Sequence, residues 1–392
     1  MPHGWMRTAA TMLAATMLAG PAAAGAIVVM TPTNISSALA QLRPGDTLQL
    51  QGNFTTRVTI RNRDFGGVSV DGSRAVLEQG LELRNIHNIT FGGLTVGRSG
   101  MAMTNRFGIN LHAATHVSVA DSRILGNGGS AGTGVRVSNS EFVTVRDTQF
   151  HGLLDGMTLI TSPNSLIARN RFESGGSDGL KVVDSQRIIL SGNSCTGFSP
   201  QPNVHPDCIQ FWSTPGRPLQ SDIYVLNNSL IGHQQGFASF DPSAHSGTRF
   251  TFAGNYAATG YVHGLTCLGC TESRFFDNVV ASLPDSRWAS QLIAPTGNGN
   301  QFANNLIFDL RGLDGPLASL LPARLYSSLV PSIAGLVGSA HDDREWRSTL
   351  VSMQSEEAAP TPEPASWMMM LFGFALVGRA LRRRQPYRTV MS

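Results

Sequence analysis

The sequence is poor in charge and nearly devoid of lysine. Charged residues make up 14% of its 392 residues, and the 29 basic residues are all arginine apart from Lys181. No basic stripe with interleaved aromatic residues occurs, which argues against a nucleic-acid partner. Long stretches with helical apolar spacing are also scarce, so strands are expected to dominate the fold.

Cysteine is scarce as well, with four residues in the chain. Their spacing does not match a zinc ribbon, so disulfides are favoured over a shared zinc ion. Cys195 and Cys208 flank a 12-residue insertion, and a bridge between them would close it. A loop of that size contributes about 3 kcal/mol in the chain-entropy model. Cys267 and Cys270 could form a second bridge.

What the sequence does contain is an internal repeat. Asp155, Asp178 and Asp207 are each followed by a small residue and an apolar–polar–apolar alternation, at offsets of 23 and 29 residues. A period of roughly 23 residues built from short strands is typical of a β-solenoid, in which equivalent positions stack about 4.8 Å apart. The repeat therefore predicts three carboxylates in one column on an outer face.

A second series marks the corners of the same repeat. Asn or Asp recurs at positions 121, 147, 170, 193, 228, 255, 278 and 305. These residue types tolerate the left-handed conformation of a sharp corner, and stacked asparagines can bond along the coil. Alternation predicts that Val135, Val137, Met157, Leu159, Leu180, Val182, Ile209 and Phe211 point inward. It predicts that Asn110, Arg136, Thr158, Lys181 and Gln210 point outward.

These features resemble the right-handed parallel β-helix superfamily of pectate lyases and polygalacturonases. Ser36 to Leu42 is expected to be a short amphipathic helix, which caps the coil in that family, and Thr47 to Leu50 the first strand. The resemblance implies an all-β, right-handed parallel β-helix of about nine or ten rungs over residues 27–310. It does not fix the chemistry, because this fold hosts lyases, hydrolases, epimerases and adhesins.

The two ends of the sequence predict export. Residues 1–26 have the pattern of a signal peptide, and residues 311–357 are expected to cap the coil or be irregular. Residues 358–392 are expected to form a linker and a tail in which Pro362-Glu363-Pro364 precedes an apolar run and an arginine cluster. That order resembles the PEP-CTERM sorting signal, which implies an exosortase-type partner, transient inner-membrane anchoring and a Gram-negative cell-surface or extracellular location. A plain C-terminal anchor is the alternative, since an apolar run of about 14 residues is marginal as a span.

Candidate functional residues are the outward polar groups that packing of a coil does not require. Those predicted to be catalytic are Asp155, Asp178, Lys181, His205 and Asp207. Those predicted to contact substrate are Arg136, Gln210, Trp212, His233 and His263. The insertion from Ser194 to Pro206 stands directly before Asp207, and long loops on a tight coil usually shape a cleft.

Three functions remain open on this evidence. A lyase acting on a uronate polysaccharide would use calcium or a positive side chain to neutralise the uronate carboxylate, with Lys181 as the base or as a stabiliser of the developing charge. A hydrolase would use two aspartates, one rung apart for retention or two rungs, about 9.6 Å, for inversion. The full polygalacturonase pattern is absent, because Asp178 is not doubled and His263-Gly264 matches only in part. The third possibility is a non-catalytic, adhesin-like protein that binds exopolysaccharide; a monomer is expected in each case.

Overall fold

The computed structural model describes residues 25–100, 106–129, 132–200, 204–241, 246–296 and 298–312. All of them belong to the first of two compact units, Met1–Val337. The second unit, Gly338–Ser392, lies outside the described residues, as do most of the predicted signal peptide, most of the predicted cap region and the whole sorting tail. No described helix is long and apolar enough to cross a membrane.

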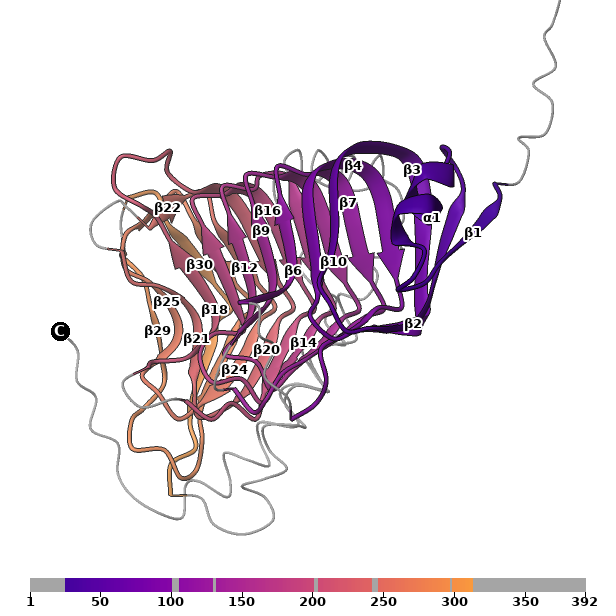
Figure 1. The fold of residues 1–392 in the computed structure, drawn as a ribbon. Helices are drawn as coiled ribbons and strands as arrows, with labels where there is room; N and C mark the ends of the chain where they lie inside the picture. Colours follow the sequence, from indigo (N-terminus) through magenta and orange to yellow (C-terminus); the bar gives the residue numbers. More distant parts are fainter. Residues whose placement is uncertain are drawn as a thin grey trace, which may run out of the picture. The chain divides into compact units, whose positions relative to one another are not determined.

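The described strands form one coil in which neighbouring turns pair in parallel (Figure 1). It is a right-handed parallel β-helix of about ten turns, which confirms the fold predicted from the repeat. The coil is built from three stacks of strands, here called faces A, B and C, joined by sharp corners. Successive turns add strands to each stack, usually one per turn; two turns on face B add two short strands each. The chain travels once around the coil between paired strands, because parallel strands cannot be joined by a tight hairpin.

The strands are distributed over the faces as follows. The first turns contain β1 (Ile27–Met30), β2 (Thr47–Phe54), β3 (Val58–Leu77) and β4 (Leu81–Gly92), the last two of which run across corners. Face A contains β6 (Phe107–His112), β9 (Thr133–Ser138), β12 (Asp155–Ile160), β15 (Leu180–Val183), β18 (Asp207–Trp212), β21 (Gln235–Ser239), β25 (His263–Cys267) and β29 (Gln291–Ile293). Face B contains β7 (Thr115–Ala120), β10 (Glu141–Arg146), β13 (Ser165–Ala168), β16 (Gln186–Ser191), β19 (Ser221–Leu226), β22 (Gly247–Thr248), β23 (Thr251–Ala253), β26 (Cys270–Thr271), β27 (Arg274–Phe276) and β30 (Gln301–Ala303). Face C contains β5 (Thr95–Val96), β8 (Arg123–Leu125), β11 (Gln149–His151), β14 (Arg171–Glu173), β17 (Ser194–Thr196), β20 (Ser229–Gly232), β24 (Tyr256–Thr259), β28 (Val279–Ser282) and β31 (Leu306–Asp309).

The N-terminal end of the coil has a short helix, α1 (Ile35–Gln41), close to where the sequence predicts one. The Arg63 guanidinium of β3 donates to the carbonyl oxygens of Leu39 (2.5 Å) and Leu42 (2.6 Å) and so ties the helix to the coil. The prediction that Thr47 begins the first strand is wrong. Strand β1 precedes the helix and pairs with β2 through Ile27 and Thr47.

The interior of the coil is apolar, as the alternation predicts. All eight residues predicted to point inward are at most 1% exposed. Aromatic rings stack from turn to turn, with the Phe252 and Phe275 centroids 5.1 Å apart and those of Phe275 and Phe302 5.0 Å apart. Burying a ring such as Phe252 or Phe275 contributes roughly 1.5–3 kcal/mol, so the stacked rings stabilise the coil, whose spacing between turns is set by the parallel pairing of the strands.

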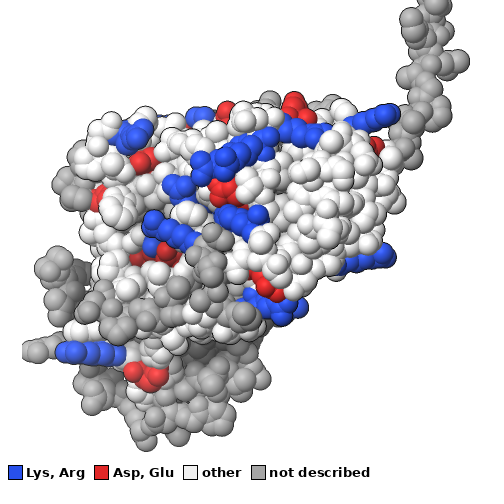
Figure 2. Space-filling view, viewed as in Figure 1, with Lys and Arg blue, Asp and Glu red and all other residues white. Residues whose placement is uncertain are grey.

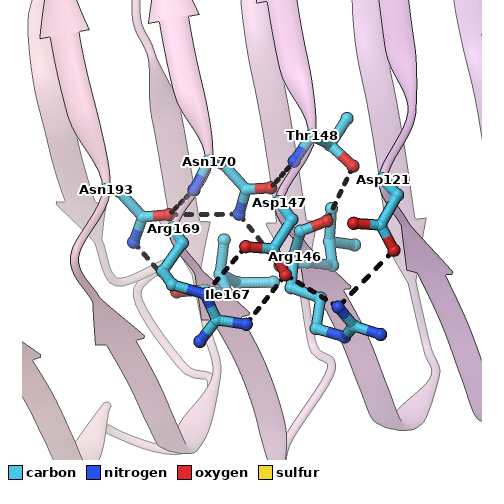
Figure 3. Close-up of polar contacts among 9 residues, drawn as sticks. Asp121, Arg146, Asp147, Thr148, Ile167, Arg169, Asn170 and Asn193 are labelled. Carbon is cyan, nitrogen blue, oxygen red and sulfur yellow. Dashed lines mark hydrogen bonds and ion pairs between the residues drawn. The ribbon is translucent and has the colours of Figure 1, made fainter. Parts of the chain in front are cut away.

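An asparagine ladder runs along the corner that follows face B (Figure 3). The side-chain amide of each member donates to the side-chain oxygen of the next, at 2.9–3.1 Å, and also to a main-chain carbonyl of the preceding turn. The members are Asn170, Asn193, Asn228, Asn255, Asn278 and Asn305. The predicted bonding between stacked asparagines is therefore confirmed for six of the eight markers.

The other two markers, Asp121 and Asp147, are one position out of step with the ladder. Thr148 occupies the ladder position of its turn and donates its main-chain N–H to Asn170 Oδ1 (3.1 Å). Asp121 and Asp147 are themselves left-handed corner residues, each with φ of 51°. Arg146 bridges both carboxylates, at 3.6 and 2.7 Å (Figure 3). The ladder asparagines have no such positive φ; in their turns the residue before the asparagine takes the left-handed conformation, for example Arg169 with φ of 52°.

Candidate active site

Face A carries the three aspartates in one column. Asp155 pairs with Thr133 of the preceding strand and Asp207 with Gln235 of the following one, and the register between them places Asp178 in the same column. The register of β21 with β25 continues the column through Gln235 to His263, at the start of β25. The structure therefore brings Asp155, Asp178 and Asp207 together at successive turns, which is the arrangement expected from the repeat.

The glycine after each of the first two aspartates is required by the packing of the turns. A Cβ added at Gly156 would lie 2.4 Å from the carbonyl oxygen of Gly179. A Cβ at Gly179 would lie 2.6 Å from the carbonyl oxygen of Cys208 and 3.0 Å from Cys195 Sγ. Such contacts are closer than van der Waals packing permits. Glycine thus lets each turn close tightly enough for the carboxylates to stack.

Two of the carboxylates are bound by the chain's single lysine. Lys181 Nζ lies 2.8 Å from Asp155 Oδ1 and 3.1 Å from Asp178 Oδ2. The column is also bonded to the backbone, because the Asp178 N–H donates to Asp155 Oδ1 (3.4 Å) and the Asp207 N–H donates to Asp178 Oδ1 (2.7 Å). Each of the first two aspartates therefore braces the turn that follows it.

Asp207 is the most buried of the three. Its side chain is fully inaccessible, and burial raises its pKa to about 7, against the lowering effect of the His205 imidazole and with a further raising effect of Asp178. Its Oδ2 accepts from Gln210 Nε2 (3.1 Å) and lies 3.6 Å from His205 Nδ1. A carboxyl that titrates near neutral pH can act as a general acid or base under physiological conditions.

Lys181 is held in its charged form. Burial lowers the pKa of its ammonium, but the charges of Asp178 and Asp155 outweigh that effect and the pKa is raised. Burial likewise raises the pKa of Asp178, against the opposing effect of Lys181. An ammonium whose pKa is raised stays protonated at neutral pH and cannot accept a further proton. The geometry therefore favours Lys181 as a group that stabilises negative charge rather than as a base.

His205 and His263 both contact the ring of Phe240. The ring of Phe240 meets His205 edge-on with centroids 6.1 Å apart and His263 edge-on at 4.9 Å. The contact with Asp207 raises the pKa of His205, whereas burial lowers the pKa of His263. His205 therefore carries charge more readily than His263, which donates to or accepts from Thr266 Oγ1 at 3.1 Å.

An open depression of about 240 Å³ lies beside Asp207. Its lining residues are His205, Gln210, Phe211, Trp212, Phe240 and Asp241. Trp212 presents 56% of its surface to solvent. Phe240 and Asp241 escaped sequence-based prediction, although they directly follow strand β21 on the turn next to Asp207.

Two outward strips run beside the acid column on face A. The first is polar and contains Glu82, Asn110, Arg136, Thr158, Lys181 and Gln210 in register. The second is apolar and contains Ile160, Val183 and Trp212. The apolar strip was not predicted, because isolated aliphatic residues on an outer face have no sequence signal of their own. An aromatic and aliphatic strip beside polar groups can accommodate a sugar ring, whose faces are apolar and whose edges carry hydroxyl groups.

Two predicted substrate contacts lie apart from the acid column. Arg136 stands two turns before Lys181 in the polar strip, with its guanidinium 5.2 Å from the Phe107 ring centroid. His233 pairs with Asp285 on an exposed corner, with Nε2 3.1 Å from Oδ2. The structure thus groups eight of the ten predicted site residues around Asp207 and separates these two.

Both predicted disulfides form, Cys195–Cys208 and Cys267–Cys270. Cys208 follows Asp207 directly, so the first bridge anchors the start of β18 to β17 in the core. The predicted insertion is shorter than expected, since Ser194–Thr196 is strand β17 and the excursion begins after it.

Calcium was predicted only for the lyase interpretation. Lys181 Nζ already contacts the carboxylates of Asp155 and Asp178. Within the described ranges, no cluster of three or more His, Cys, Asp or Glu side chains is arranged to hold a metal ion. The residues present therefore offer calcium a poor fit, and calcium binding stays a prediction.

The chain belongs to the right-handed β-helix family. The family model for the right handed beta helix region matches residues 47–195 and 107–307, well over half of the chain. A second model, the PEP-CTERM protein-sorting motif, matches residues 360–384. That motif indicates export and sorting to the surface of Gram-negative bacteria. No curated protein matches the sequence.

Solved structures with similar coils have diverse functions. Pectate lyase Pel9A is 15% identical with a TM-score of 0.42, over 81% of this chain and 86% of that one. DFA-IIIase from Arthrobacter chlorophenolicus A6, in complex with DFA-III, is 14% identical with a TM-score of 0.49, over 77% and 86%. PfbA, a surface adhesin of Streptococcus pneumoniae, is 12% identical with a TM-score of 0.44, over 71% and 80%. Likenesses this distant carry no argument about the activity of this chain.

Proposed function

We propose that this chain is an exported glycoside hydrolase that cleaves an acidic polysaccharide at the cell surface. The observation that carries the proposal is Asp207, a fully buried carboxyl whose pKa is raised to about 7, at the end of a column of stacked carboxylates. A protonated Asp207 would act as general acid and donate its proton to the glycosidic oxygen as the bond breaks.

Asp155 is the proposed base. It lies two turns from Asp207, about 9.6 Å along a stack with the usual strand spacing, and that separation leaves room for a water molecule as inversion requires. Lys181 contacts Asp155 at 2.8 Å and so stabilises its carboxylate. Asp178 stands between them. Its Oδ1 accepts the Asp207 N–H and its Oδ2 lies 3.1 Å from Lys181 Nζ, so it is proposed to position its neighbours rather than to act on the sugar.

The state of Lys181 favours hydrolysis over β-elimination. A lyase needs a group that removes the proton beside the uronate carboxylate. Lys181 is charged and bound by two carboxylates, so it offers no lone pair for that step. The lyase interpretation therefore depends on a base other than Lys181. If such a lyase used calcium, its activity would be lost on adding a chelator.

The substrate class follows from the strips beside the acid column. Trp212 and the apolar strip would pack against sugar rings, while His205 and Arg136 would approach uronate carboxylates. Much of the surface in view in Figure 2 is uncharged, its basic side chains form a band and a few smaller groups, and several acidic side chains adjoin basic ones. We therefore assign recognition of the substrate to Trp212, the apolar strip, His205 and Arg136 rather than to a general positive field.

The proposal is tested by incubating the full chain with a panel of uronate polysaccharides. New reducing ends without ultraviolet absorbance from a new double bond are expected. The Asp207→Asn variant should reduce the rate by about 10²-fold or more, because an amide cannot donate the proton. Absorbance from a new double bond would identify a lyase. If neither product formed from any of the substrates, the proposal that the chain is an enzyme acting on this class of polysaccharide would be overturned.

Non-catalytic binding is the second candidate, and the exposed Trp212 beside Val183 and Ile160 favours it. A binding protein would hold the polysaccharide on this platform without using the acids. Retention of the chain on immobilised polysaccharide should then survive Asp207→Asn and be lost in Trp212→Ala, with no products released. Turnover that depends on Asp207 would rule out this alternative.

A further inference from the structure

The hydrogen-bonding pattern of the acid column stops at Asp207. Asp155 and Asp178 each use Oδ1 to accept the main-chain N–H of the next residue in the column. At the following turn that donor is already taken, because the Gln235 N–H donates to the carbonyl oxygen of Pro206 at 2.7 Å. Asp207 Oδ1 therefore lacks the partner that the earlier turns provide.

Two buried acceptor oxygens are left without a donor at this point. Within the part of the chain that the structure describes, neither Asp207 Oδ1 nor Gln235 Oε1 has a hydrogen-bond partner. Asp207 is fully buried and Gln235 is 8% exposed. The two residues are paired in the register of β18 and β21, so their side chains start about 4.8 Å apart on the same face. An unsatisfied buried acceptor destabilises the folded state, so two of them at paired positions favour a shared proton.

We propose that Gln235 is a positioning residue of this site, whose amide oxygen accepts a proton carried by Asp207 Oδ1 and keeps that carboxyl in its acid form. One proton satisfies both orphan oxygens, and the Asp207 Oδ2 atom remains bonded to Gln210. The inference deepens the proposed function, since a general acid must hold its proton until the glycosidic bond breaks. It names a residue that sequence reasoning did not select.

The surroundings of Asp207 are consistent with this assignment. The charged and titratable groups that act on its carboxyl are His205 in the segment before β18, Asp178 before β15 and Lys181 on β15. His205 and Lys181 favour the ionised form, whereas burial and Asp178 favour the neutral form. Gln235 acts from the opposite turn, where it adds no charge and selects the protonated form through a hydrogen bond alone.

The alternative orientation of the amide makes the opposite prediction. If Gln235 were rotated so that Nε2 faced Asp207, it would donate to the carboxylate and favour the ionised form. Removing the amide would then raise the pKa of Asp207, whereas removing an acceptor for its proton would lower it. The sign of a single shift therefore decides between the two arrangements.

The test is a titration of the full chain labelled with ¹³C at the aspartate carboxyls, with Asp207→Asn used to assign the resonance. The Gln235→Leu variant should lower the pKa of Asp207 by about one unit, the shift expected for one lost hydrogen bond. Gln210→Leu is the matched control, because it removes a donor to Oδ2 and should raise the pKa instead. Gln235→Met provides a second variant of similar length if Gln235→Leu does not fold.

A raised or unchanged pKa of Asp207 in both Gln235 variants would overturn the proposal. The readout needs no substrate, so a lowered pKa would stand even if the chain hydrolysed none of the polysaccharides tested. Conversely, hydrolysis that depends on Asp207 together with an unshifted titration would leave the proposed function intact and remove Gln235 from it.

Discussion

At the scale of single residues, Asp207 combines complete burial with a carboxyl that remains protonated to near neutral pH. Its pKa of about 7 in the folded protein lies above the ordinary value of 3.8. Between those values the folded state binds more protons than the unfolded state, so stability falls as pH rises. The contribution of this group is fully present below pH 3.8 and is lost as pH rises through about 7.

Asp207→Asn should therefore remove this pH dependence. Relative to the unmodified chain, the variant should gain stability toward alkaline pH, by at most about 4 kcal/mol for a shift of roughly three units. Urea unfolding midpoints measured across the pH range would show the difference. Asp222→Asn is the control with opposite sign, because the bonds from Arg249 and Ser221 overcome burial and lower the pKa of Asp222. Parallel pH profiles for Asp207→Asn and the unmodified chain would contradict the assignment.

Lys181 gives a second prediction at this scale. If it serves as a fixed charge between Asp155 and Asp178, Lys181→Arg should keep most of the turnover on a cleaved polysaccharide. Lys181→Ala should lose about 10²-fold, because two carboxylates would face each other without a counter-ion. The comparison is made by initial rates at saturating substrate. Equal losses of turnover in Lys181→Arg and Lys181→Ala would indicate instead that Lys181 carries a proton in the reaction.

The acid column and Lys181 could be predicted from the sequence, but Phe240, Asp241 and Gln235 could not, and neither could the protonation of the site. The repeat placed Asp155, Asp178 and Asp207 in one column because a β-helix converts sequence offsets into stacking. The raised pKa of Lys181 depends on both carboxylates lying within 3.1 Å of one ammonium, and that of Asp207 on its burial. The distances around the Lys181 ammonium and the burial of Asp207 depend on side-chain conformations and on the loops that cover the site, which a repeat pattern does not specify.

At the scale of structural elements, the asparagine ladder is expected to be a main source of stability. Asn228 donates to the Leu190 carbonyl and to Asn255, and its Oδ1 accepts from Asn193. Asn228→Ala should cost about 2–4 kcal/mol, since several buried groups lose their partners. Asn227→Gly is the matched control, because the corner with φ of 54° suits glycine and only an exterior side chain is removed. Similar unfolding free energies for the two variants would contradict the ladder's role.

The two disulfides should differ in their contributions. Cys195–Cys208 closes a segment with a sequence separation of 13, whereas the separation for Cys267–Cys270 is 3. Replacing the first pair by alanine should cost about 3 kcal/mol, and replacing the second pair should cost less, because a shorter loop restricts the unfolded chain less. Urea denaturation of the two double variants would measure this. A greater loss from the second pair would show that local strain or packing outweighs loop closure.

The corner markers show how far an element can be predicted. Six ladder asparagines were found from their period, but Asp121 and Asp147 were placed one residue away from their structural equivalents. Asn and Asp suit both the ladder and the left-handed corner beside it, so residue type alone does not separate the two positions. Only the register, in which Thr148 bonds to Asn170, resolves the difference.

At the scale of the whole molecule, the sorting motif at residues 360–384 predicts where the protein is found. Deleting these residues should abolish sorting to the cell surface without unfolding the coil, whose described strands end at Asp309. Replacing Pro362, Glu363 and Pro364 by alanine keeps the apolar run and the arginines, and should have the same effect. Cell fractionation and surface labelling provide the measurement. Normal surface sorting of the alanine variant would favour a plain membrane anchor.

The stacking of turns has a consequence for how such a site can change. Distances between groups in one column are quantised, since each step is one strand spacing of about 4.8 Å. Deleting the turn that carries Asp178 would bring Asp155 and Asp207 to a single step, the separation associated with retention rather than inversion. A gain or loss of one whole turn is thus a discrete switch in stereochemistry, and the remaining turns keep the same type of core, corner and pairing.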